Sequence, residues 1–102
     1  DEETVTLILK TYFPEMKENA LKQFVGLFMD LQLKAEHSEI STKSVDIRGM
    51  IGALKTIQTG LNPTAAVNMG ITNKSFDIFE REIVEDIVMT RISDDWTRSD
   101  VF

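Results

Sequence analysis

The residues best suited to chemistry form the short run Ser41-Thr42-Lys43-Ser44, which precedes a helical pattern in the middle of the chain. Hydroxyl side chains at such a position can cap the free amide groups of a helix start, and those amides attract anions. A lysine in a first turn opposes the helix dipole, at a cost of about 0.3–1 kcal/mol, but it adds a full positive charge to an anion site. The run therefore predicts either a phosphate-binding helix start or a capped surface helix whose lysine is simply solvated.

Other catalytic groups are scarce. His37 is the only histidine and the chain has no cysteine, which excludes thiol chemistry and does not predict a metal site. The acidic run that begins at Glu80 is typical of a solvated helix face, because Arg81 and Glu85 stand four residues apart. The sequence contains neither a GxxxxGK[ST] phosphate loop nor a GxSxG elbow. We therefore do not expect this chain to be an enzyme on its own.

The elements that must position these residues are predicted to be helices. Apolar residues recur at helical spacing in every long segment, which predicts an all-α fold, a small bundle of four to five helices. The helical pattern is interrupted by residues that start or end helices, namely Pro14, Gly60, Asn62-Pro63 and Gly70. The expected helices cover residues 4–13, residues 14–36, a segment capped by Ser41 or Thr42 and stopped by Gly60, residues 64–69, and residues 77–91. The β-branched residues among residues 4–9 also allow a strand there.

The inward faces of the helices follow from the same spacing. Gly26, inside the second helix, costs about 1 kcal/mol against alanine and predicts a close approach by another helix. The residues expected to face the core include Val5, Leu9, Tyr12 and Phe13 in the first helix, Phe24, Leu27 and Leu31 in the second, Met50, Leu54 and Ile57 in the third, and Phe79, Ile83, Val84, Ile87 and Val88 in the last.

The chain length of 102 residues allows one domain. Residues 1–92 are expected to form the helical domain, and residues 93–102 a C-terminal tail. This tail is polar apart from Trp96, Val101 and Phe102, which are expected either to pack back on the domain's own core or to dock a partner.

Composition excludes several classes of protein. Eleven basic against seventeen acidic side chains give a net charge of −6, which argues against a nucleic-acid partner because phosphate neutralisation needs a basic surface. No apolar stretch is long enough for a membrane span, so no membrane is expected and the predicted compartment is the cytoplasm. The chain begins with Asp1 rather than Met, which we interpret as a piece of a longer protein.

Three segments that follow one another resemble the C-terminal domain of the CbbQ/NirQ/NorQ type of AAA+ ATPases. These are MoxR-related proteins associated with activating Rubisco, nitric oxide reductase and similar enzymes. The resemblance covers roughly residues 4–90, and it is clearest in Ile40-Ser41-Thr42-Lys43-Ser44, in residues 53–67 (ALKTIQTGLNPTAAV) and in residues 67–74 (VNMGITNK).

The resemblance implies that the chain is the α-helical lid that follows the nucleotide-binding core. In that family the residue after Ser-Thr is typically arginine, the sensor-2 residue that contacts the γ-phosphate, and the matching residue here is Lys43. Lysine keeps the charge but lacks the planar two-pronged contact of arginine. The implied nucleotide-binding residues are thus Ser41, Thr42 and Lys43, and the implied cofactors of the full-length parent are ATP and Mg²⁺.

The same resemblance implies the partners: the missing N-terminal AAA+ core, the neighbouring subunits of a homo-oligomeric ring, and a client enzyme complex. An alternative function from a different class is an independent helical adaptor that binds another protein and uses Trp96, Val101 and Phe102 as a docking segment. A GxxxxGK[ST] motif upstream in the parent reading frame would distinguish the two.

The isolated chain is expected to show neither ATPase activity nor tight ATP binding. It lacks a phosphate loop, and one lysine at a helix start supplies only a fraction of the contacts that hold a nucleotide. Calorimetric titration with ATP and a phosphate-release assay measure both properties. A micromolar affinity would contradict the interpretation of the chain as a lid.

Overall fold

The computed structural model describes residues 1–75 and 77–102. Within these residues the chain forms only helices and turns, so the predicted all-α fold is confirmed. None of the helices described is long and apolar enough to cross a membrane. In chain order the elements are α1 (Glu2–Tyr12), α2 (Glu18–Glu36), the 3-10 helix η1 (Thr42–Ser44), α3 (Ile47–Gln58), α4 (Pro63–Gly70), the 3-10 helix η2 (Thr72–Lys74), α5 (Ile78–Arg91) and α6 (Arg98–Val101).

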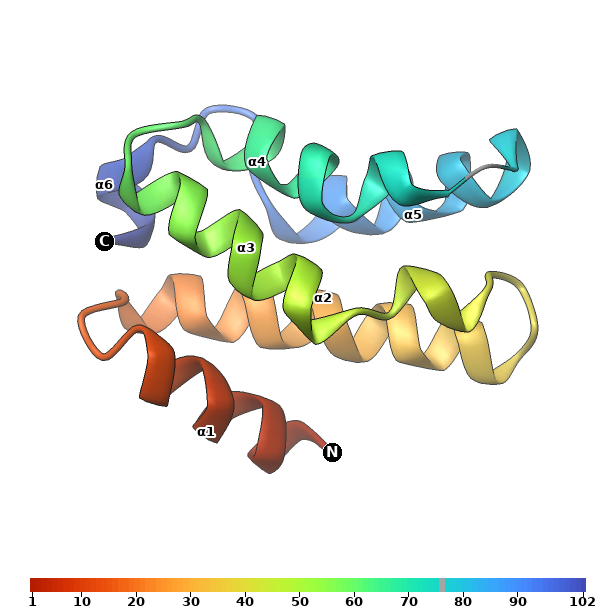
Figure 1. The fold of residues 1–102 in the computed structure, drawn as a ribbon, viewed down its shortest axis with the longest axis horizontal. Helices are drawn as coiled ribbons and strands as arrows, with labels where there is room; N and C mark the ends of the chain where they lie inside the picture. The colour runs from red at the N-terminus through yellow and green to blue at the C-terminus, as the bar shows by residue number, and fades with distance from the viewer. Residues whose placement is uncertain (76) are drawn as a thin grey trace.

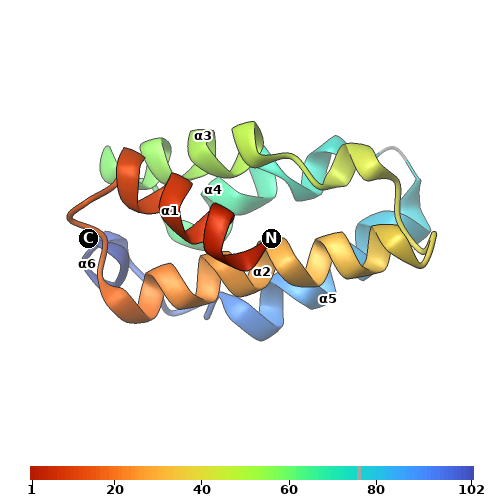
Figure 2. The same cartoon turned by 90° about the horizontal axis from the view of Figure 1, so that it is seen from below.

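The long helix α2 organises the bundle. It packs against α1 and α5 and also touches η1 and α6, while α3 packs against α4 on the other side of the molecule (Figures 1 and 2). Its apolar stripe is the centre of the core, and burial of such side chains contributes about 1.5–3 kcal/mol each. The largest side chains with almost no exposed surface come from all the main helices: Leu9, Phe24, Leu27, Leu31, Met50, Leu54, Ile57, Val67, Val84 and Val88.

The start of α2 differs from the sequence prediction. Pro14 lies in a turn between α1 and α2, and α2 begins only at Glu18. The turn buries Phe13 and Met16, and the Met16 amide donates to the Phe13 carbonyl at 3.1 Å. A continuous helix from Pro14 would not form this turn, so burial of the two apolar residues overrides the helix-start preference of proline.

Two aromatic residues predicted to face the core are exposed. Tyr12 is 55% exposed, and the Lys55 ammonium lies 5.8 Å from the centre of its ring. Phe79 is 73% exposed. The buried face of α5 is set by Val84 and Val88, and at 100° per residue Phe79 lies about 140° and 180° around the helix from them.

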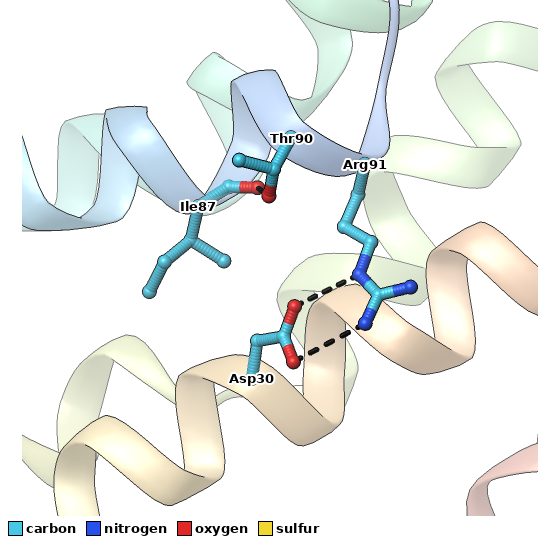
Figure 3. A network of polar contacts seen from close by, with 4 residues as sticks. All are labelled: Asp30, Ile87, Thr90 and Arg91. Atoms are coloured by element: carbon cyan, nitrogen blue, oxygen red, sulfur yellow. Dashed lines mark hydrogen bonds and ion pairs between the residues drawn. The ribbon is translucent and has the colours of Figure 1, made fainter.

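Gly26 allows a close approach, as predicted, but the approaching group is a side chain. The Arg91 guanidinium of α5 lies over Gly26, where an added Cβ would stand 2.5 Å from Arg91 Cζ. Arg91 donates from Nε and Nη2 to the Asp30 carboxylate of α2 at 2.8 and 3.3 Å (Figure 3). This hydrogen bonding holds the pKa of Arg91 above its ordinary value. The absence of a side chain at Gly26 thus makes room for an ion pair between α2 and α5.

The last ten residues pack back on the bundle. Val101 is fully buried, Trp96 and Phe102 pack against the core, and the Phe102 ring meets the Phe13 ring edge-on at 5.8 Å between centroids. Residues 98–101 form the short helix α6, which the sequence did not predict. Of the two interpretations of this tail, packing on the domain's own core is confirmed.

Helices α3 and α4 approach each other through two glycines. A Cβ added at Gly49 would lie 2.5 Å from the Gly70 carbonyl oxygen, and one added at Gly70 would lie 2.7 Å from the Gly49 carbonyl oxygen. Both contacts are with backbone, which cannot move aside as a flexible side chain does.

Gly49→Ala should therefore lower the free energy of unfolding by about 1–3 kcal/mol, the usual cost of overpacking. Gly52 in the same helix is the matched control, because a Cβ there meets nothing within 4 Å. Gly52→Ala should raise the free energy of unfolding by about 0.5–1 kcal/mol through better helix propensity. Urea unfolding of the two variants measures both effects, and equal responses would contradict the close contact.

Candidate anion-binding site

The predicted site residues lie in and next to η1, at the end of the bundle opposite α6 (Figures 1 and 2). Ser41 precedes η1, and its Oγ accepts a hydrogen bond from the Lys43 amide at 3.2 Å. Ser41 is half-buried, whereas Thr42 and Lys43 are exposed. The structure thus brings the three predicted residues together in one short turn on the surface.

This turn is not the start of α3, which corrects the sequence prediction. Ser41 caps η1, and α3 begins separately at Ile47 with Asp46 as its N-cap. The Asp46 carboxylate accepts the Arg48 amide at 3.0 Å. Because aspartate is a strong capping residue, it starts a new helix after the turn instead of lying inside a longer one. Lys43 therefore does not oppose the dipole of α3.

Asp46 also holds a lysine that the sequence analysis missed. Lys74, the last residue of η2, places its Nζ 2.9 Å from Asp46 Oδ2. The Lys74 ammonium lies close to Gly49, where an added Cβ would be 3.1 Å from it. Contact between η1 and η2 completes this cluster. A capping residue at position 46 could have been inferred from its type, but no local pattern connects it with a lysine twenty-eight residues later.

The ion pair keeps the Asp46 carboxyl ionised. The hydrogen bond from Lys74 is the main reason that its pKa lies below the ordinary value of 3.8, and the Arg48 and Gly49 amides lower this pKa further against the opposing effect of burial. The carboxylate therefore occupies the N-terminus of α3. Attraction of an external anion to this part of the molecule must come from side-chain charge more than from free amides.

Lys43 supplies that charge. Its side chain is exposed and, among the residues that the structure describes, its ammonium has no ion pair or hydrogen bond. The nearby Glu39 is already paired with Lys34 at 3.3 Å. Arg48, in the first turn of α3, is a second exposed cation. Lys43 and Arg48 are thus two exposed cations near η1 on a chain of net charge −6, and an anion could be attracted to them.

Three other features of the described residues were candidates for a site. A groove of about 910 Å³ lies between α1 and α2, and none of the predicted site residues lines it. His37 is the C-cap residue of α2, and the described part of the chain has no group of three His, Cys, Asp or Glu residues that could hold a metal ion. Arg81 donates to the Ser75 carbonyl at 2.8 Å, so it serves as a link to the segment before α5.

Comparisons of the chain with models of known protein families, with curated protein sequences and with solved structures find no match. The family resemblance therefore stays a prediction from the sequence, and functional arguments depend on the cluster itself.

Asp46→Ala should lower the free energy of unfolding by about 1 kcal/mol at pH 7, because it removes the cap of α3. Asp46→Asn should lower the free energy of unfolding by a smaller amount, because the asparagine side-chain oxygen can still accept a hydrogen bond from the Arg48 amide. The folded pKa of Asp46 is lowered, so the stability that its charge contributes is present above pH 3.8 and is lost as the pH falls through the folded pKa.

Urea unfolding of wild type and Asp46→Asn at pH 7, 5 and 3 tests this sign. The difference in the free energy of unfolding between wild type and Asp46→Asn should be largest at pH 7 and should shrink toward pH 3. Asp77→Asn is the control, because Asp77 caps α5 through the Phe79 amide at 2.8 Å without an ion pair in the described residues. A difference that grows toward acid would contradict the assignment.

Proposed function

We propose that this chain is the C-terminal helical lid of a cytoplasmic AAA+ ATPase, and that Lys43 contacts the nucleotide phosphates when the lid closes over the nucleotide. The observation that carries the proposal is the ammonium of Lys43, which is exposed on the turn between α2 and α3 and has no ion pair or hydrogen bond among the described residues. The family resemblance places its sensor cation at this same residue.

The sequence has no phosphate loop, so the proposal assigns the groups that catalyse ATP hydrolysis to the parent protein's N-terminal core. The N-terminal core would supply the phosphate loop, the carboxylates that hold Mg²⁺ and the residue that positions the attacking water. The lid would add one cation and a surface for the neighbouring subunit of a homo-oligomeric ring. ATP binding and hydrolysis by the whole protein would then activate or remodel a client enzyme complex.

Lys43 suits a role in the transition state of this reaction. Charge spreads over the phosphoryl oxygens during transfer, so a cation positioned near them gains more interaction energy there than in the ground state. Ser41 engages the Lys43 amide and so shapes the turn. Thr42 is exposed beside it and can offer a hydroxyl to a phosphate oxygen.

The alternative function, an independent helical adaptor, loses its strongest support. Its proposed docking segment lies against the bundle itself, because Val101 is fully buried and Phe102 packs on Phe13. An adaptor would need another surface, and the groove between α1 and α2 carries both acidic and basic residues without a clear preference for a partner.

In the parent ATPase, Lys43→Ala should lower turnover at least about tenfold, which corresponds to roughly 1.4 kcal/mol of barrier. Lys43→Arg should keep or raise activity, because a guanidinium can contact a phosphate with two donors. Steady-state ATP hydrolysis measures both. The fold should be unaffected, since the Lys43 side chain has no partner in the described residues.

Lys22→Ala is the matched control. Lys22 is also an exposed lysine, but it lies in the first half of α2, about 20 Å along the helix from the end that precedes η1. The parent ATPase with Lys22→Ala should hydrolyse ATP at the wild-type rate. If Lys43→Ala also behaves like the wild type, Lys43 is an ordinary solvated lysine and the proposal is wrong.

A further inference from the structure

We infer that Asp46 sets the charge of the Lys43 site by holding Lys74, so that this ion pair regulates how strongly phosphate groups bind there. The inference rests on the proposed function, because it concerns the anion that Lys43 would contact. The Asp46–Lys74 pair (2.9 Å between Oδ2 and Nζ) is otherwise only a link between α3 and η2.

The pair lies close enough to Lys43 to act on the same ligand. Residues 43 and 46 are three positions apart, so their Cα atoms are at most about 11 Å from each other. The residue that carries the other charge, Lys74, belongs to η2, which is in contact with η1. At low salt, where the Debye length is about 30 Å at 0.01 M, charges at this separation are hardly screened.

The Asp46–Lys74 pair would affect anion binding through the net charge around Lys43. Among the charged residues near η1, Lys43 and Arg48 are exposed cations, Glu39 is paired with Lys34, and Asp46 is paired with Lys74. Neutralising Asp46 leaves Lys74 unbalanced and raises the local charge. Neutralising Lys74 leaves the Asp46 carboxylate unbalanced and lowers it. The two changes should therefore shift the affinity for a phosphate anion in opposite directions.

A purely structural role predicts a different result. If the pair only held η2 against α3, loss of either partner would loosen the same contact and weaken binding in both cases. The direction in which each variant changes the affinity for phosphate therefore distinguishes an effect of charge from a structural role of the pair. Both partners are more than a third exposed, so breaking the pair should not unfold the chain.

The test is a titration of the 102-residue chain with inorganic tripolyphosphate at 10 mM ionic strength, followed by amide chemical shifts around η1. Asp46→Asn, which keeps an acceptor for the Arg48 amide, should bind about two- to threefold more tightly than wild type. Lys74→Met should bind about two- to threefold more weakly, and the double variant should bind like wild type. These differences should disappear in 1 M salt, where the Debye length is about 3 Å.

Two further variants make each outcome decisive. Lys22→Ala should bind like wild type and Lys43→Ala more weakly. If Lys43→Ala weakens binding but Asp46→Asn and Lys74→Met change it in the same direction or not at all, the inference about the pair is overturned and the proposed function stands. If wild type shows no shifts around η1, or if Lys43→Ala binds like wild type, the inference about the pair is overturned, whereas the proposed function is decided by the turnover of the Lys43→Ala parent ATPase.

Discussion

The contact between Gly49 of α3 and Gly70 of α4 is the constraint on which the geometry of the candidate site depends. Each residue lies where any side chain would collide with the other's carbonyl oxygen. Because η2 follows α4 almost at once, this crossing brings Lys74 over the first turn of α3. Only then can Asp46 hold both the Arg48 amide and the Lys74 ammonium. A contact that fixes helix packing therefore also fixes the charge around Lys43.

Side chains cap helix starts at both ends of the bundle, as Asn62 does for α4 near α6, but the ends differ in what else satisfies their backbone groups. At the end near α6, the C-terminal segment supplies the partners: the Lys17 amide donates to the Val101 carbonyl at 2.8 Å, and Arg98 Nε donates to the Gln58 carbonyl at 2.8 Å. At the other end, side chains of Ser41 and Asp46 cap the helix starts. At the end near α6, these polar groups hydrogen-bond to one another and so hold the C-terminal segment against the bundle. The arrangement at the other end leaves charged side chains at the surface, where a ligand can meet them.

The helices were predictable because their apolar periodicity is regular and their punctuation is strong. Asn62 caps α4 through the Ala65 amide at 3.1 Å with Pro63 just inside, as the dipeptide indicated. The errors arose where tertiary contacts compete with local preference. Pro14 was expected to start a helix, but burial of Phe13 and Met16 required a turn.

The candidate site was predictable only in part, for the same reason. The run around Lys43 was recognised from its residue types, and the structure keeps it on the surface. The Asp46–Lys74 pair was missed because its partners come from α3 and η2, which meet only after α3 and α4 have packed. The tail was described as a separate segment since four residues of α6 are too few to show periodicity.

If Lys43 contacts a nucleotide as proposed, the geometry around it implies that a second domain supplies most of the binding contacts. The Lys43 amide donates to the Ser41 hydroxyl oxygen and the Arg48 amide donates to the Asp46 carboxylate, so two backbone donors that could have bound a phosphate are already in use. The groups that remain are the Lys43 ammonium and the exposed Thr42 hydroxyl, and an ammonium attracts any anion without orienting it. A lysine of this kind adds charge at a defined place and very little selectivity. Under the proposed function, recognition of a particular nucleotide would come from the surface over which this end of the bundle closes, and Lys43 would strengthen binding after that closure.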